Sequence, residues 1–188
     1  MPEAATTSPI PTSYAALEAL DPDAWAQLYV EARPVLWRFA RTRLATDEQA
    51  EDAVSDTLVR AMAAIGRYCA SPQSSGGIIG WLVGIERNVI HEIYRAGARL
   101  RSVPFAPEAD AAEPAERLVA ADEASAVRFA FALLPEDDRE LLGLRVVANL
   151  DSATTARILG KRPGAVRMAQ ARALGRLRVT LNEADRER

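Results

Sequence analysis

The residues whose type and spacing point most clearly to chemistry lie near the C-terminal end of this 188-residue chain. Between positions 161 and 178 there are six basic residues and no acid: Lys161, Arg162, Arg167, Arg172, Arg176 and Arg178. Basic side chains contact DNA phosphates, and a helix in the major groove can also read base edges. We interpret this segment as a candidate DNA-binding element. The residues alone leave two alternatives, a solvated arginine face and a basic tail that binds any acidic surface.

A second set of charged residues, Asp52, Asp56 and Arg60, repeats every four residues. In a helix this spacing places all three side chains on one face, opposite or oblique to the apolar stripe. One interpretation is a docking surface for a partner protein. The other is a solvated face with an ion pair between Asp56 and Arg60, and the spacing does not decide between them.

The segment from Ser71 to Gly80 is rich in glycine and serine and is flanked by Tyr68 and Trp81. Aromatic rims and a mobile backbone suit an unstacked base of single-stranded nucleic acid. The alternative is a plain surface loop between two aromatic residues of the core.

Other kinds of chemistry find little support. The single cysteine, Cys69, excludes an internal disulfide and a multi-cysteine metal site, and the single histidine, His91, argues against a zinc centre or a histidine-based triad. No pair of acids suggests general acid and base catalysis. We therefore expect no enzyme activity, no catalytic residue, no metal site and no cofactor. Short apolar stretches and an N-terminus unlike a secretory signal lead us to expect a cytoplasmic protein without membrane insertion.

Apolar residues recur at intervals of three and four, which predicts amphipathic helices. These helices must position the groups described above. The predicted helices cover residues 25–40, 50–68 and 81–95, and a further apolar set runs from 127 to 147. Thr46 and Gln49 predict a capping box at the start of the second helix, and residues 69–80 interrupt the pattern. The chain shows no strand-like alternation and no internal repeat, so the predicted fold class is all-α.

The C-terminal segment has the outline of a helix-turn-helix. Asp151 can cap a short helix that ends near Leu159, Gly160 supplies the turn, and Pro163 suits the first position of the final helix. The apolar stripe of that helix is Val166, Ala169, Ala173, Leu177 and Leu181.

The composition, 49% hydrophobic and 26% charged, is that of a globular protein. Residues 1–20 are expected to form a flexible tail. Residues 102–121 are rich in proline, alanine and acids and are expected to form a linker. The predicted domains are therefore residues 21–101 and 122–181.

Together these features resemble the extracytoplasmic-function (ECF) group of the sigma-70 family, the small promoter-recognition subunits of bacterial RNA polymerase. The resemblance spans about residues 21–101 and 122–180, and no long region 3 separates the halves. The segments similar to region 2 are LYVEARPVLWRFARTRL, AEDAVSDTLVRAM and WLVGIERNVIHEIYR. Those similar to region 4 are LPEDDRELLGLRVVANL and ARILGKRPGAVRMAQARALGRLR.

The resemblance implies two small helical domains, a region 2 bundle and a region 4 helix-turn-helix. It implies a non-enzymatic subunit that binds core polymerase, through the clamp helices of the largest subunit and the flap, and directs it to promoter DNA. An anti-sigma factor is a further implied partner. The implied clamp contacts are Asp52, Asp56 and Arg60. The implied DNA-binding residues are Arg87 and Asn88 for the minus-ten element, and Arg162, Gly164, Ala165, Arg167 and Arg172 for the minus-thirty-five element.

The chain departs from the family pattern at a few positions. Ser55 stands where glutamine is usual, Arg162 where a serine or threonine cap is usual, and Thr154, Thr155 and Ala156 replace Glu-Ile-Ala. These changes bear on promoter preference and on cap stability. The alternative function is a stand-alone helix-turn-helix regulator whose N-terminal domain senses a ligand or dimerises; an all-α enzyme lacks any candidate nucleophile or phosphate loop.

Overall fold

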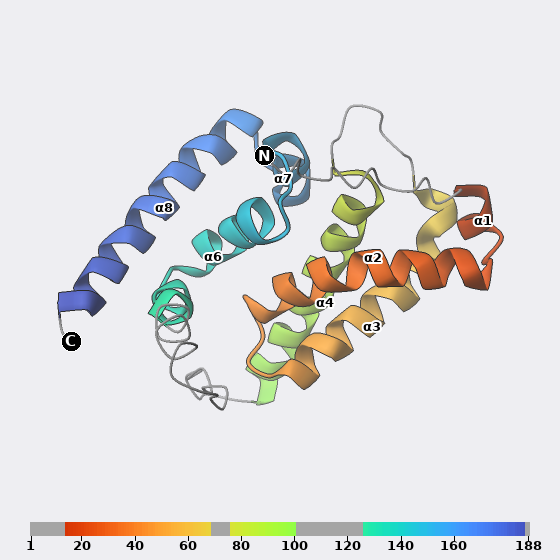
Figure 1. Ribbon diagram of the computed structural model, residues 1–188, viewed down its shortest axis with the longest axis horizontal. Coiled ribbons are helices and arrows are strands. Elements are labelled where there is room, and N and C mark those ends of the chain that lie inside the picture. Colours follow the sequence, from red (N-terminus) through yellow and green to blue (C-terminus); the bar gives the residue numbers. More distant parts are fainter. Residues whose placement is uncertain (1–13, 69–75, 101–125, 187–188) are drawn as a thin grey trace, which may run out of the picture.

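The computed structural model describes residues 14–68, 76–100 and 126–186 (Figure 1). All regular secondary structure in these ranges is helical, which confirms the predicted all-α class. The expected linker, residues 102–121, lies outside the described residues.

The first half of the chain is a bundle of three long helices. Its elements are α1 (Tyr14–Glu18), α2 (Pro22–Arg41), α3 (Asp47–Ala64), the 3-10 turn η1 (Ile65–Arg67) and α4 (Gly77–Leu100). Helices α2, α3 and α4 pack against one another in pairs, and their apolar stripes meet in one core. The largest fully buried apolar side chains of this core include Leu28, Leu36, Phe39, Val54, Leu82 and Ile90.

The start of α3 follows the predicted capping pattern. The Thr46 side chain accepts a hydrogen bond from the Gln49 backbone N–H at 3.2 Å. In a capping box the Gln49 side chain would accept from the Thr46 N–H. Here it accepts instead from the N–H of the preceding residue, Ala45, at 3.1 Å. These bonds satisfy backbone donors that the helix itself leaves free, so a local sequence signal sets this boundary.

Two segments expected to be irregular are partly helical. Helix α1 lies inside the expected tail of residues 1–20, where Leu17 is fully buried and its carbonyl accepts a hydrogen bond from the Trp25 indole at 3.1 Å. Helix α4 begins at Gly77, four residues before the expected start at Trp81. Gly77 has φ +46°, a left-handed conformation that glycine adopts without strain.

The second half contains the predicted helix-turn-helix. Residues 126–132 are helical, followed by α6 (Glu136–Leu142), a π-helical turn η2 (Gly143–Val147), α7 (Ser152–Leu159) and α8 (Pro163–Arg186). The Asp151 side chain accepts from the Thr154 N–H at 2.7 Å, and Gly160, with φ +63°, ends α7 in the left-handed conformation. The predicted cap, turn and helix start are all confirmed.

Part of the second half packs into the apolar core of the first, while α6, α7 and α8 also form smaller buried clusters of their own. Leu144, Ala148 and Leu150 of the second half belong to the same buried cluster as the residues of α2, α3 and α4. At Gly143 the backbone lies so close to α2 that an added Cβ would be 3.1 Å from both Phe39 Cε2 and Thr42 Oγ1. In Figure 1, α7 accordingly lies beside the N-terminal end of α4.

Glu86 is an unusual member of α4. Its side chain is fully buried, and neither carboxylate oxygen has a hydrogen-bond partner. Burial raises the pKa of Glu86 to about 9. The carboxyl is therefore protonated in the folded protein at neutral pH.

This protonation makes stability depend on pH. Between the unfolded pKa of 4.5 and the folded value of about 9, the folded chain holds a proton that the unfolded chain has lost, so stability falls as pH rises. For one proton the free energy of unfolding falls by about 1.4 kcal/mol per pH unit. We expect Glu86→Gln to remove this contribution, so that its free energy of unfolding depends less on pH. Urea unfolding at pH 5, 6, 7 and 8 measures the slope. The exposed Glu31→Gln is the control and should keep the wild-type slope; a wild-type slope in Glu86→Gln would contradict the prediction.

Candidate functional site

The acidic face of α3 is exposed. Asp52, Asp56 and Arg60 all point to solvent on one side of the helix. One of the two interpretations included an ion pair between Asp56 and Arg60, and this part of it is wrong: Arg60 Nη2 lies 2.8 Å from Glu92 Oε2 on α4. The hydrogen bond to Glu92 raises the pKa of Arg60, and Asp56 adds only a weaker charge attraction. Arg60 therefore links α3 to α4, while Asp52 and Asp56 form no salt bridge with another described residue.

Two exposed apolar side chains lie beside these acids. Val59 is 66% and Met62 41% exposed on α3. Val59 follows Asp56 by three residues and Met62 follows Val59 by three, so the side chains are neighbours on the helix surface. The sequence analysis did not select Val59 or Met62 as candidate site residues. Both are apolar and lie outside the apolar stripe of α3, and this pattern could have marked them as exposed.

Arg87 on α4 is tied to the second half of the chain. Its Nε donates to Glu140 Oε1 of α6 at 2.6 Å. The same oxygen lies 3.2 Å from His91 Nε2 and 3.4 Å from Arg43 Nη1. Burial alone would raise the pKa of Glu140, but the hydrogen bond from Arg87 and the charges around it outweigh burial and lower that pKa. Glu140 is thus an ionised acid at the centre of a basic cluster.

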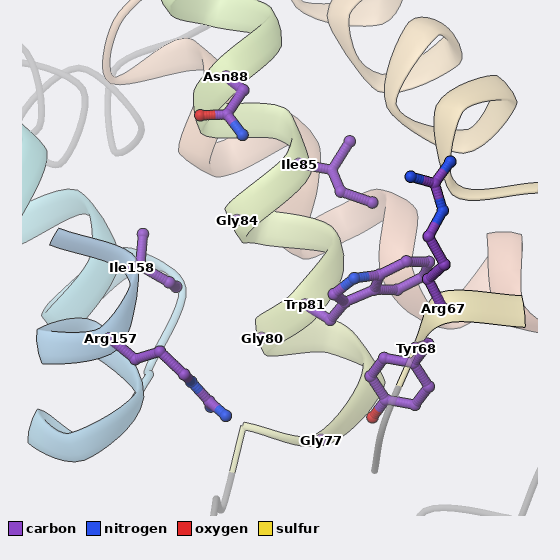
Figure 2. A pocket seen from close by; sticks show the side chains of 10 residues that line it. All are labelled: Arg67, Tyr68, Gly77, Gly80, Trp81, Gly84, Ile85, Asn88, Arg157 and Ile158. Carbon is purple, nitrogen blue, oxygen red and sulfur yellow. The ribbon is translucent and has the colours of Figure 1, made fainter. Parts of the chain in front are cut away.

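Asn88, the next residue of α4, is exposed and lines a cavity of about 320 Å³ (Figure 2). Tyr68 and Trp81 form one wall, with ring centroids 4.9 Å apart and planes tilted by 46°. Arg157 and Ile158 of α7 form the opposite wall, and Gly80 and Gly84 of α4 lie between them. Both aromatic side chains also pack on the core, as the second of the two sequence interpretations expects, while stacking of a base on them stays a prediction.

The final helix separates its apolar and basic faces. Val166 and Ala173 are fully buried, Ala169, Leu177 and Leu181 are partly buried, and the predicted stripe is confirmed. The candidate DNA-binding residues of this segment, Arg162, Gly164, Ala165, Arg167 and Arg172, are all exposed. Arg162 occupies the position before α8, where its carbonyl accepts from the Val166 N–H at 3.1 Å.

Arg176 differs from the other arginines of α8. It contacts Asp138 of α6 through two guanidinium nitrogens, with Nη2 2.7 Å from Oδ1. Asp138 is only 7% exposed, so this pair joins α6 to α8. Arg176 is therefore a structural residue. The basic stretch of residues 161–178 contains this salt-bridged arginine as well as exposed candidate DNA-binding arginines such as Arg167.

No helix in the described ranges is long and apolar enough to cross a bilayer. The same residues contain no group of three or more histidine, cysteine or acidic side chains that could hold a metal ion.

Known proteins resemble this chain along most of its length. The family model for Sigma-70 region 2 matches residues 28–100. The ECF RNA polymerase sigma factor SigD of Mycobacterium tuberculosis is 31% identical over 166 residues, which cover 84% of this chain and 77% of the relative. The chain belongs to the ECF sigma factors. ShbA of Streptomyces griseus, another ECF sigma factor, is 31% identical over 172 residues, covering 85% of this chain and 88% of ShbA.

Solved structures agree with this assignment. The sigma factor RpoE of Bartonella quintana, solved with the anti-sigma factor NepR, has 26% identity and a TM-score of 0.67, covering 84% of this chain and 96% of that one. CnrH, solved with the cytosolic domain of CnrY, shares the fold at 23% identity and a TM-score of 0.65, covering 90% and 95%. As an ECF sigma factor the chain is a transcription initiation factor that binds core RNA polymerase and promoter DNA, and a stand-alone regulator is not favoured.

The pairing of Arg176 gives a stability prediction. Arg176→Ala leaves the nearly buried Asp138 without its partner, so we expect the sigma factor to melt about 2–4 °C lower. Arg172→Ala, an exposed residue of the same helix, should leave the melting temperature unchanged. Thermal unfolding followed by circular dichroism measures both. Equal melting temperatures for the two variants would refute the structural role of Arg176.

Proposed function

We propose that this sigma factor reads the minus-thirty-five element with α8, the minus-ten element with α4 and its cavity, and docks on polymerase with α3. The observation that carries the proposal is the division of α8 into a buried apolar face and an exposed face that is basic and free of acids up to Arg178. In this proposal the protein acts by binding polymerase and placing it on promoter DNA, and we assign no catalytic group to it.

The geometry at the N-terminal end of α8 supports major-groove reading. Helix-turn-helix proteins present the first residues of the second helix to base edges. Gly164 and Ala165 are small and exposed there, so the backbone can approach DNA closely. Arg167 follows on the exposed side and Arg172 lies more than one turn further along, where a phosphate is the expected partner.

The α3 face supports protein docking. The exposed acids Asp52 and Asp56 are followed on it by the exposed apolar side chains of Val59 and Met62. An apolar centre with a charged rim is typical of a protein interface. We assign this surface to the clamp helices of the largest polymerase subunit, and the second domain to the flap.

The α4 surface supports minus-ten reading. Arg87 and Asn88 supply polar groups, while Tyr68 and Trp81 offer rings on which an unpaired base can stack. We also propose an anti-sigma factor as a regulatory partner, since RpoE of Bartonella quintana is solved with one. The proposed partners place the protein in the cytoplasm.

The DNA assignment is tested with Arg167→Ala and Arg172→Ala in reconstituted holoenzyme. The template is promoter DNA selected in vitro with the wild-type holoenzyme, with a version scrambled at minus thirty-five as competitor. A lost base contact costs about 1–3 kcal/mol and relaxes discrimination, while a lost phosphate contact lowers the salt slope by about one. We expect Arg167→Ala to lose discrimination. Wild-type affinity, salt slope and discrimination in both variants would remove α8 from the DNA interface.

The docking assignment is tested with Asp52→Lys/Asp56→Lys. Reversing both charges should weaken binding to core polymerase at least tenfold without changing helix content, since both acids are exposed. Fluorescence titration of labelled sigma factor with core polymerase gives the affinity. Glu31→Lys/Glu183→Lys makes the same charge change at exposed positions elsewhere. Equal affinity for the two double variants would exclude the α3 face.

A further inference from the structure

We propose that helix α1 takes part in promoter recognition: its Tyr14 ring holds Tyr68 against Trp81, so that the aromatic wall of the α4 cavity is in place before an unpaired base arrives. Tyr14 is then a positioning residue, because it acts through Tyr68 and does not itself line that cavity. The inference rests on the proposed role of α4 and its cavity in reading the minus-ten element.

Three aromatic rings are linked in pairs, with Tyr68 as the shared member. The ring centroids of Tyr14 and Tyr68 lie 5.4 Å apart with planes tilted by 38°, and those of Tyr68 and Trp81 lie 4.9 Å apart with a tilt of 46°. Favourable tilted aromatic pairs have centroids roughly 4.5–7 Å apart, so both contacts are attractive. Helix α1 lies beside η1, which directly precedes Tyr68 (Figure 1). Tyr68 therefore connects α1 to α4.

Tyr68 stands where the helical structure of α3 and η1 ends. Its backbone is extended, with φ −70° and ψ 120°, and its N–H donates to the Ile65 carbonyl at 2.9 Å. Beside its side chain lies a second cavity of about 180 Å³, lined by Tyr14, Glu18, Ile65 and Tyr68. The Tyr68 side chain thus has room to turn toward α1, and the Tyr14 ring is the group that limits this movement.

The two tyrosines also interact through their hydroxyl groups. Burial raises the pKa of Tyr68, and a hydrogen bond with the Tyr14 side chain raises it further. The Tyr68 hydroxyl therefore stays protonated at neutral pH and keeps this bond. Ring contact and hydrogen bond together give Tyr68 one preferred position.

Helix α1 is fixed to the bundle by the residue one turn after Tyr14. Leu17 is fully buried in the core of the first half, and the three-residue spacing places Tyr14 on the same face of the helix. The Leu17 carbonyl also accepts the hydrogen bond from the Trp25 indole. A helix of five residues is not stable alone in water, so α1 depends on these contacts. The support for Tyr68 therefore comes from the bundle through α1.

A ring that is already held binds a base more tightly than a ring that must first be ordered. Fixing a side chain during binding lowers the affinity, and a preset side chain avoids this loss. Tyr14→Ala should therefore weaken binding of an unpaired minus-ten strand about two- to tenfold. Binding to core polymerase and discrimination at minus thirty-five should stay unchanged, because Tyr14 lies on neither proposed surface.

The test uses reconstituted holoenzyme and two DNA probes. Both are versions of the selected promoter with an unpaired minus-ten strand, and the second probe carries abasic sites in place of the unpaired bases. We expect Tyr14→Ala to lose affinity for the first probe and to bind the second like the wild type, because no base remains to stack. Tyr14→Phe keeps the ring and should lose less than Tyr14→Ala. The matched control, Tyr29→Ala, removes an exposed tyrosine of α2 and should bind both probes like the wild type.

The outcomes separate this inference from the proposed function. Tyr68→Ala and Trp81→Ala remove the aromatic wall itself; if both bind the first probe like the wild type, the cavity does not read the minus-ten element and the proposed function is wrong. If either of them loses affinity but Tyr14→Ala does not, the inference alone fails. It also fails if Tyr14→Ala loses as much affinity for the abasic probe, or if Tyr14→Phe loses as much as Tyr14→Ala.

Discussion

The buried charge of Arg43 is the constraint on which the arrangement of the two halves depends. A guanidinium removed from water needs acids beside it, and Arg43 obtains them from Glu136 and Glu140 of α6. These contacts fix where α6 lies on the first bundle. A buried ion pair contributes little net stability, because the groups lose their hydration when they meet. The contact therefore specifies where the two halves meet more than it adds to their stability.

Helix α4 serves several partners at once. Its apolar side packs in the bundle through residues such as Leu82 and Ile90, and its Gly80 and Gly84 lie against α7. Arg87 and Asn88 lie on the remaining surface, and Arg87, a residue of the proposed DNA contact, donates a hydrogen bond to Glu140 of the second half. The buried Glu86 sets a pH-dependent limit on the stability of this helix.

Local signals in the sequence predicted local structure well. The Thr46 cap, the turn at Gly160 and the apolar stripe of α8 depend on residues within a few positions of one another, and all are confirmed. Contacts between distant residues were not predictable from spacing. Arg60 binds Glu92 rather than Asp56, and Arg176 binds Asp138 rather than facing outward with its neighbours. The predicted break at residues 69–80 includes Gly80, whereas Gly80 and Gly84 lie one turn apart on α4 and Gly76 directly precedes that helix.

The close fit of Thr154 against Gly76 and Gly80 bears on how freely such sigma factors can exchange domains. The Thr154 side chain fills the space that the two glycines leave open. The two halves are therefore shaped for each other as well as for their outside partners. A chimera that takes one half from a relative would lose this fit unless the relative carries side chains of the same size on both sides of the contact.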